Sequence, residues 1–194
     1  MTRHSQGINL SVEAHTKKTS ILIICNHKDE KWRTLLEEQL RVLEVDVWTD
    51  RDVGVGEDWH ETIKDALRNA SVAVLLISPY FLASDFVRKE EVAGLLERRD
   101  KEGFRIIPII ARECAWQQVE WLARMQVRPR DGRALENMKK SSVMTELKNV
   151  VLELADIIST LGNHSRRTKD DERLPHNEAN RTASSTSVRI WKRV

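Results

Sequence analysis

Two side chains near the middle of the chain, Phe86 and Glu90, have types and a spacing that could do chemistry. They lie four positions apart in the charged stretch Ser84-Val92, where a helix is predicted to begin, and residues four apart on a helix share a face. An aromatic ring beside a carboxylate can hold a planar cationic group. From the spacing alone, the more common arrangement is that Phe86 belongs to the core and Glu90 is a solvated surface charge.

The strand that precedes this pair decides where the carboxylate would lie. Val72-Ile77 is a continuous apolar run, the pattern of a strand covered on both faces, and Ser78-Pro79 ends it. Open α/β folds bind their ligands at the carboxyl ends of parallel strands. A helix that begins just after this strand can therefore bring Glu90 to a ligand-binding edge.

Other apolar runs alternate with helical patterns along the chain. Strands are predicted at 20–25, 45–48, 72–77 and 104–110, and helices at 29–43, 59–69, 85–99 and 143–161, with Gly162 as a cap. A poor fifth strand is expected near Met125-Arg128, and Pro108 indicates a bulge or an edge position. The alternation predicts a flavodoxin-like, doubly wound α/β fold: a parallel sheet of about five strands in the order 2-1-3-4-5, with helices on both faces.

In this strand order, the connections after strands one and three leave in opposite directions and open a crevice. Cys25-Asn26-His27 and the segment Ser78-Glu90 would line it, and the polar loop Thr49-Asp58 lies next to it. The chain has no GxGxxG turn and no phosphate-binding P-loop. A dinucleotide would therefore be held without the usual glycine-rich turn.

Length and composition favour one domain with polar ends. The 194 residues are interpreted as a flexible leader at 1–18, a domain at 19–162 and a disordered polar tail at 163–194. A net charge of +2 favours no nucleic-acid partner, and no run is apolar enough for a membrane partner. The two cysteines lack metal-ligand spacing, so no metal is expected, and with no secretory signal the protein is expected in the cytoplasm.

Four blocks of the sequence resemble the Toll/interleukin-1 receptor (TIR) domain family, and in particular its bacterial form. They are residues 21–30, 47–59, 73–86 and 105–110, in the family's order, and the resemblance covers about residues 18–160. In many TIR domains the activity is cleavage of NAD+ between nicotinamide and ribose, by a glutamate in an aromatic-x-x-x-Glu pattern. The resemblance therefore implies that Glu90 is the catalytic residue and Phe86 the aromatic one. Glu91 competes with Glu90, but on a helix it points about 100° away from Phe86.

The resemblance also assigns roles to two loops. It implies that Cys25 and Asn26, in the turn after strand one, contact the substrate. The loop around Asp52 and Gly54 resembles the one that covers the dinucleotide and joins neighbouring TIR domains. The family often has an aromatic and a small or basic polar residue where this chain has Cys25-Asn26. NAD+ would be consumed as a substrate, so no cofactor is expected, and the partners implied are other TIR domains in a homo-oligomer formed on activation.

Two functions follow from the resemblance. The first is an enzyme, an NAD+ nucleosidase or cyclase that acts in a defence or cell-death response. The second is a non-catalytic adaptor that signals by homotypic TIR assembly through the loop at 50–56. A response-regulator receiver shares the strand order but needs a phosphoacceptor aspartate after strand three, where this chain has Ser78-Pro79. We set that third class aside.

Overall fold

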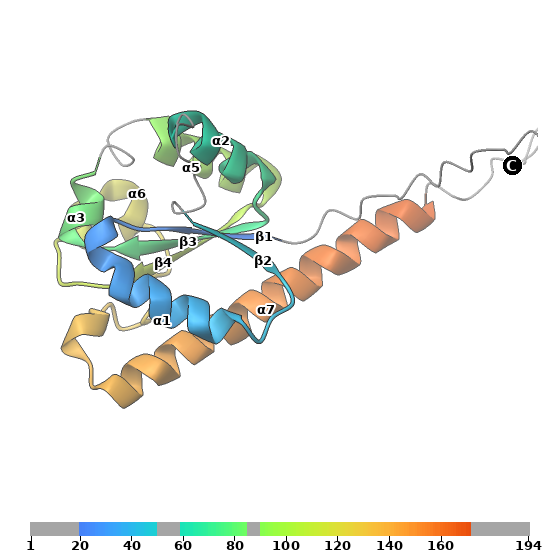
Figure 1. Cartoon of the computed structure of the whole chain (residues 1–194). Helices are drawn as coiled ribbons and strands as arrows, with labels where there is room; N and C mark the ends of the chain where they lie inside the picture. Colours follow the sequence, from blue (N-terminus) through green and yellow to red (C-terminus); the bar gives the residue numbers. More distant parts are fainter. Residues whose placement is uncertain (1–19, 50–58, 85–89, 172–194) are drawn as a thin grey trace, which may run out of the picture.

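Four parallel strands in the order β2-β1-β3-β4 form the central sheet (Figure 1). The computed structural model describes residues 20–49, 59–84 and 90–171, and at 59–61, 63, 90–91 and 162–171 it describes the backbone alone. The strands are β1 (Ser20–Ile24), β2 (Asp46–Thr49), β3 (Val72–Ile77) and β4 (Arg105–Ile110). The predicted doubly wound α/β fold is confirmed, with strand order 2-1-3-4.

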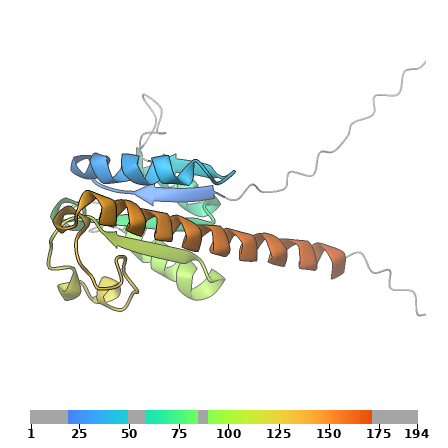
Figure 2. The ribbon, with the colours of Figure 1, turned by 90° about the horizontal axis from the view of Figure 1, so that it is seen from below.

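Helices cover both faces of the sheet (Figures 1 and 2). One face carries α1 (Glu30–Leu40) and α7 (Lys140–Asp171), and the other carries α2 (Trp59–Asn69) and α5 (Glu90–Glu102). The connections hold the short helices α3 (Pro79–Leu82) and α6 (Glu120–Ala123) and the 3-10 turns η1 (His27–Asp29), η3 (Trp116–Gln118) and η4 (Leu135–Asn137). This arrangement places the sheet as the middle of three layers.

The core divides into two clusters, one on each face of the sheet. Every residue of β3 is buried, as its continuous apolar run predicts. Successive side chains of a strand point to opposite faces, so Val72 and Val74 pack with α1 and α7, whereas Ala73 and Leu75 pack on the side of α2 and α5. Burial on both faces fixes the strand register and therefore the positions of the strand ends.

The predicted fifth strand is reduced to a single bridge between Ile109 and Arg128. The backbone N–H of Arg128 donates to the Pro108 carbonyl at 2.8 Å, and the N–H of Ile110 donates to the Arg128 carbonyl at 2.7 Å. The next backbone hydrogen bond toward the start of β4 would have to be donated by the N–H of residue 108, and proline has none. The expected edge position of Pro108 is confirmed, and the same residue explains why the fifth strand does not extend.

The helices differ from the prediction mainly at α7 and α3. α7 passes through Gly162 to Asp171, so residues 163–171 are helical although they were assigned to the tail. A single glycine costs about 1 kcal/mol in a helix and does not by itself end one. The distal end of α7 extends well beyond the sheet (Figures 1 and 2). The short helix α3 was not expected: Ser78 caps it by accepting the Phe81 N–H at 3.1 Å, and Pro79 occupies its first position.

Candidate functional site

The turn after β1 is tied to the helix after β3. Cys25 is half-buried and packs against the core on the side of α1 and α7. The Asn26 side chain accepts the Lys28 N–H at 3.1 Å through Oδ1 and donates through Nδ2 to the Tyr80 carbonyl at 3.4 Å. Asn26 thus bridges two segments separated by more than 50 positions, at the edge of the sheet where Cys25 and Asn26 were expected.

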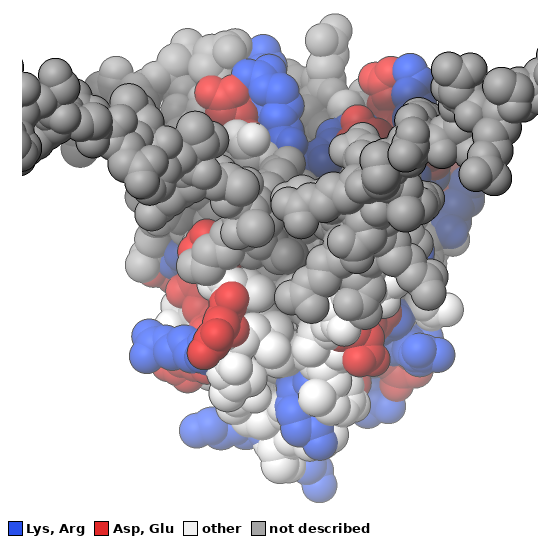
Figure 3. Space-filling model, turned by 90° about the vertical axis from the view of Figure 1, so that its right-hand side faces the viewer, with Lys and Arg blue, Asp and Glu red and all other residues white. Residues whose placement is uncertain are grey.

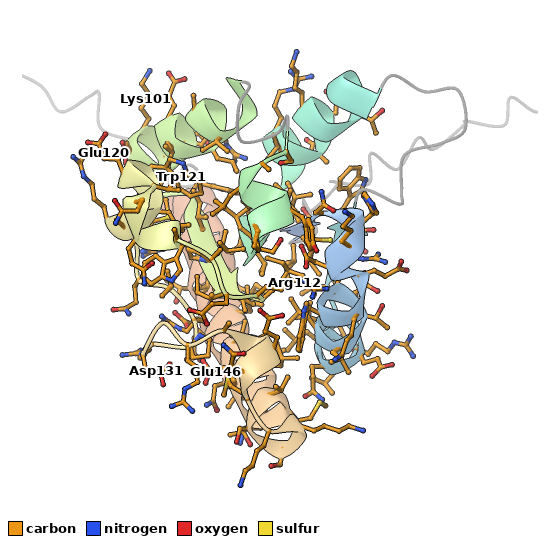
Figure 4. All side chains as sticks on the ribbon, turned by 90° about the vertical axis from the view of Figure 1, so that its left-hand side faces the viewer. Lys101, Arg112, Glu120, Trp121, Asp131 and Glu146 are labelled. Carbon is orange, nitrogen blue, oxygen red and sulfur yellow. The ribbon has the colours of Figure 1, made fainter. Side chains whose placement is uncertain are left out.

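A buried carboxylate, Asp29, joins the carboxyl ends of three strands. Its side chain is fully buried, accepts a hydrogen bond from the Ser78 hydroxyl, and accepts a second from Arg112 Nε at 2.7 Å. Asp29 follows β1, Ser78 follows β3 and Arg112 follows β4, and Figure 4 shows Arg112 near the middle of this edge. A buried charge is tolerated only with such partners, so these three residues fix the turns relative to one another.

Arg112 extends the network toward the surface. Its Nη2 donates to the Lys28 carbonyl at 2.8 Å, and its Nη1 lies 3.5 Å from Oε2 of Glu136 in η4. The other carboxylate oxygen of Glu136 accepts the Glu113 N–H at 2.7 Å. The hydrogen bond to Asp29 raises the pKa of the Arg112 guanidinium, which therefore stays charged at every working pH. Arg112 is fully engaged with protein groups and acts as a positioning residue.

Tyr80 presents an exposed aromatic ring at this edge with two cations beside it. Lys28 Nζ lies 4.4 Å from the ring centroid, and the Arg112 guanidinium lies 5.7 Å from it. Among the residues described, no carboxylate pairs with Lys28. An ammonium held over a ring by cation–π attraction can still receive an anionic group from solution. The edge is therefore suited to a ligand that carries negative charge.

The remaining predicted site residues cannot be placed as side chains. Asp52, Gly54 and Phe86 lie outside the described residues, and at Glu90 only the backbone, the first residue of α5, is described. α5 leads from the carboxyl end of β3 back to the start of β4. It therefore begins at the same end of the sheet as the turn after β1, which holds Asn26 (Figure 1). The contacts of Glu90 with the other site residues stay a prediction.

Sequence reasoning missed two residues that build this edge, Asp29 and Arg112, and it named Ser78 and Tyr80 only as part of the segment Ser78-Glu90. The sequence pattern indicates a helix start at Asp29 and a strand end at Ser78, and it gives Arg112 no role. One signal was present, because the carboxyl ends of parallel strands share an edge, where an acid after one strand can meet a base after another. Several acids follow β1, however, and the spacing does not choose among them.

The described part of the chain has neither a metal-binding cluster nor a membrane-spanning helix. Across residues 20–49, 59–84 and 90–171, no group of three or more histidine, cysteine, aspartate or glutamate side chains could hold a metal ion. Over the same ranges, no helix combines the length and apolarity needed to cross a membrane.

Comparison with known proteins gives one family. The sequence model of the TIR domain matches residues 21–140. An uncharacterised protein of Sinorhizobium fredii, y4lF, is 34% identical over 120 residues, which are 60% of this chain and 37% of that protein. The chain thus matches little more than a third of that relative's length.

Two solved structures match part of the chain. The TIR domain of the Toll-related receptor TRR-2 from Hydra magnipapillata is 25% identical, with 48% of this chain and 71% of that chain covered, and a TM-score of 0.37. The RPS4 and RRS1 TIR domain heterodimer is 14% identical, with 71% and 97% covered, and a TM-score of 0.46. Both TM-scores are low, so the sequence match at residues 21–140 is the stronger finding.

Proposed function

Because the chain belongs to the TIR domain family, we propose that it is an NAD+ glycohydrolase of a defence or cell-death signalling response, with Glu90 as its catalytic residue. The observation that carries this proposal is the hydrogen bond that Asn26 Nδ2 donates to the Tyr80 carbonyl. It joins the turn after β1 to α3, and the chain leads from α3 to Glu90 at the start of α5. The proposed crevice lies between these segments.

The chemistry of NAD+ explains why a single carboxylate suffices. Most glycosidases need a second carboxyl group to protonate the leaving oxygen. In NAD+ the bond between the ribose C1′ and the pyridinium nitrogen breaks with both electrons going to nitrogen, and nicotinamide leaves as a neutral molecule. Positive charge then develops on the ribose, where the Glu90 carboxylate stabilises it. Water adds to C1′ and loses a proton to solvent, which completes the hydrolysis.

Residues at the carboxyl edge have separate roles in binding. The Lys28 ammonium over Tyr80 attracts the pyrophosphate of the dinucleotide, because it has no carboxylate partner among the described residues. Asn26, held by Tyr80 and Lys28, shapes the wall next to the ribose, and the half-buried Cys25 adds an apolar surface beside it. Phe86 packs beside the nicotinamide.

The ion pair between the buried Asp29 and the half-buried Arg112 supports this site. It fixes the turn that carries Asn26 and, through Ser78, the start of α3. Groups held in this way lose little freedom when substrate binds, which is the physical basis of preorganised electrostatic stabilisation.

The loop around Asp52 and Gly54 covers the bound dinucleotide and contacts a second TIR domain in the proposed active assembly. Activity should then rise more steeply than in proportion to protein concentration. The assay is therefore run over a range of concentrations and with a crowding agent.

The test is nicotinamide release from NAD+ by the purified full chain, followed by chromatography. Glu90→Ala is compared with Glu91→Ala, which removes the adjacent carboxylate of the same helix turn and serves as the matched control. We expect wild type and Glu91→Ala to release nicotinamide and Glu90→Ala to release almost none. Activity retained by Glu90→Ala would remove Glu90 from the mechanism.

The adaptor function gives a different pattern in the same experiment. An adaptor would release no nicotinamide at any concentration, and its assembly would be unchanged by Glu90→Ala but lost in variants of Asp52 or Gly54. Sedimentation of the same samples distinguishes the two functions.

A further inference from the structure

A hollow of about 380 Å³ lies at the start of β4, away from the carboxyl edge. Four arginines and one glutamate contribute its charged lining: Arg99, Arg105, Arg124, Arg128 and Glu153. They come from α5, β4, the end of α6 and the chain that follows it, and α7. Its volume lies near the lower end of small-molecule sites, which span roughly 300–1,000 Å³.

Pro108 explains why the hollow is there. The fifth strand does not extend toward the start of β4 beyond its bridge at Arg128, because Pro108 cannot donate the next backbone hydrogen bond in that direction. The edge of β4 at Ile106 and Ile107 is therefore not covered by a neighbouring strand, and these two residues line the hollow. The hollow occupies the position that a longer fifth strand would have filled.

Arg128 and Glu153 form the fixed wall of the hollow. The guanidinium donates to both oxygens of Glu153, from Nε at 2.8 Å and from Nη2 at 2.6 Å, and the Arg128 side chain is 8% exposed. A bidentate pair of this kind is geometrically rigid. It holds the chain after α6 against α7. The other three arginines of the lining are then available to bind a ligand.

The other three arginines are held loosely or have no partner. Arg99 pairs with its neighbour Asp100 at 2.9 Å, and Arg124 pairs with Glu120 at 2.5 Å in a contact where both side chains are at least 75% exposed. Exposed pairs of this kind contribute little free energy, so a stronger anion can replace them. Arg105 has no carboxylate partner among the described residues. The guanidinium groups around the hollow therefore outnumber the carboxylates that pair with them.

The rest of the lining is largely apolar. Ile106, Ile107, Met125 and Ile157 contribute hydrophobic surface beside the arginines. Figure 3 views the molecule from the side where the strands begin, and its described part shows basic and acidic side chains interspersed. That mixture favours a small anion over a polyanion, which would need an extended basic surface.

We propose that this hollow binds a small organic phosphate, a phosphomonoester with an apolar or aromatic body. Arginine forks match phosphate oxygens in pairs, so Arg105 and Arg124 bind the phosphate. Ile106, Met125 and Ile157 contact the body of the ligand. This site is separate from the proposed NAD+ site, and its test does not depend on Glu90.

The test uses phenyl phosphate as the probe, titrated into the full chain with isotope-labelled isoleucine methyl groups and followed by NMR. Phenol and inorganic phosphate are titrated separately, so that the contributions of the body and the anion are distinguished. We expect saturable shifts of the Ile106, Ile107 and Ile157 methyl signals with phenyl phosphate, and none of Ile24, which is buried on β1. We expect weaker binding of inorganic phosphate and none of phenol.

Variants locate the site. Arg105→Ala and Arg124→Ala should each weaken phenyl phosphate binding by about tenfold, since a charge-assisted hydrogen bond is lost. Arg133→Ala, which removes an exposed arginine outside the hollow, should leave the affinity unchanged. The proposal fails if wild type shows no saturable shifts at these methyl groups, or if Arg105→Ala and Arg124→Ala bind as wild type does.

Discussion

Arg112→Ala should destabilise the fold by about 2–3 kcal/mol, because it leaves the buried Asp29 carboxylate without its cationic partner. Removing one member of a buried ion pair costs about 3–5 kcal/mol. The Arg112 side chain is 30% exposed, so water can enter the space it leaves and recover part of that loss. The Ser78 hydroxyl remains as a donor to Asp29, and it too limits the cost.

Urea denaturation followed by tryptophan fluorescence measures this loss, since the chain has six tryptophans. Arg68→Ala is the control: Arg68 pairs with Asp65 on the surface of α2, both side chains are more than 60% exposed, and the expected change is less than about 0.5 kcal/mol. The reasoning would be refuted if Arg112→Ala lost no more stability than Arg68→Ala.

A second background identifies the cause of the loss. Asp29→Asn removes the buried charge and nearly keeps its shape, so Arg112→Ala should cost at least about 1 kcal/mol less in that background than in wild type. Equal costs in the two backgrounds would mean that Arg112 stabilises the fold by packing and not by pairing with the charge.

Three further predictions concern other parts of the molecule. Gly132→Ala should destabilise the fold by about 1–2 kcal/mol, because Gly132 has a φ of +72° and a Cβ would lie 3.0 Å from the Trp116 ring. Gly94→Ala should instead stabilise α5 by about 0.5–1 kcal/mol, since a Cβ there meets nothing within 4 Å. Thermal melts of both variants measure whether stability falls in Gly132→Ala and rises in Gly94→Ala. A gain in stability in Gly132→Ala would contradict the first prediction. Burial raises the pKa of the Cys114 thiol, so its alkylation by iodoacetamide, followed by mass spectrometry, should need a higher pH in the folded chain than in urea. Because the pKa of this thiol is higher in the folded chain than in the unfolded one, its contribution to the free energy of unfolding is lost as pH rises through the folded pKa. Alkylation rates with the same pH profile in the folded chain and in urea would contradict the prediction.

The order of the elements could be predicted because each core segment carries its own periodicity. The run Val72-Ile77 has no polar residue, which predicts a strand covered on both faces, and all six residues are buried. Pro108 was correctly placed at an edge by the N–H it lacks. The end of α7 was not predictable in this way, because Gly162 permits a helix to end without requiring it.

Of the candidate site, the sequence predicted which turns lie together at the carboxyl edge. Parallel strands bring their carboxyl ends to one edge, which placed Asn26 correctly beside the chain that follows β3. The pairing of Asp29 with Arg112, 83 positions away, depends on the orientation of side chains in three separate turns. Neither residue's neighbours in the sequence indicate that orientation, so the network appeared only in the structure.

The most direct test of the central claim is the ratio of nicotinamide release rates for Glu91→Ala and Glu90→Ala at the same protein concentration. Loss of a preorganised electrostatic group typically slows a reaction by about 100- to 1,000-fold. We therefore predict a ratio of about 100 or more. A ratio near one, with both variants as active as wild type, would contradict catalysis by Glu90.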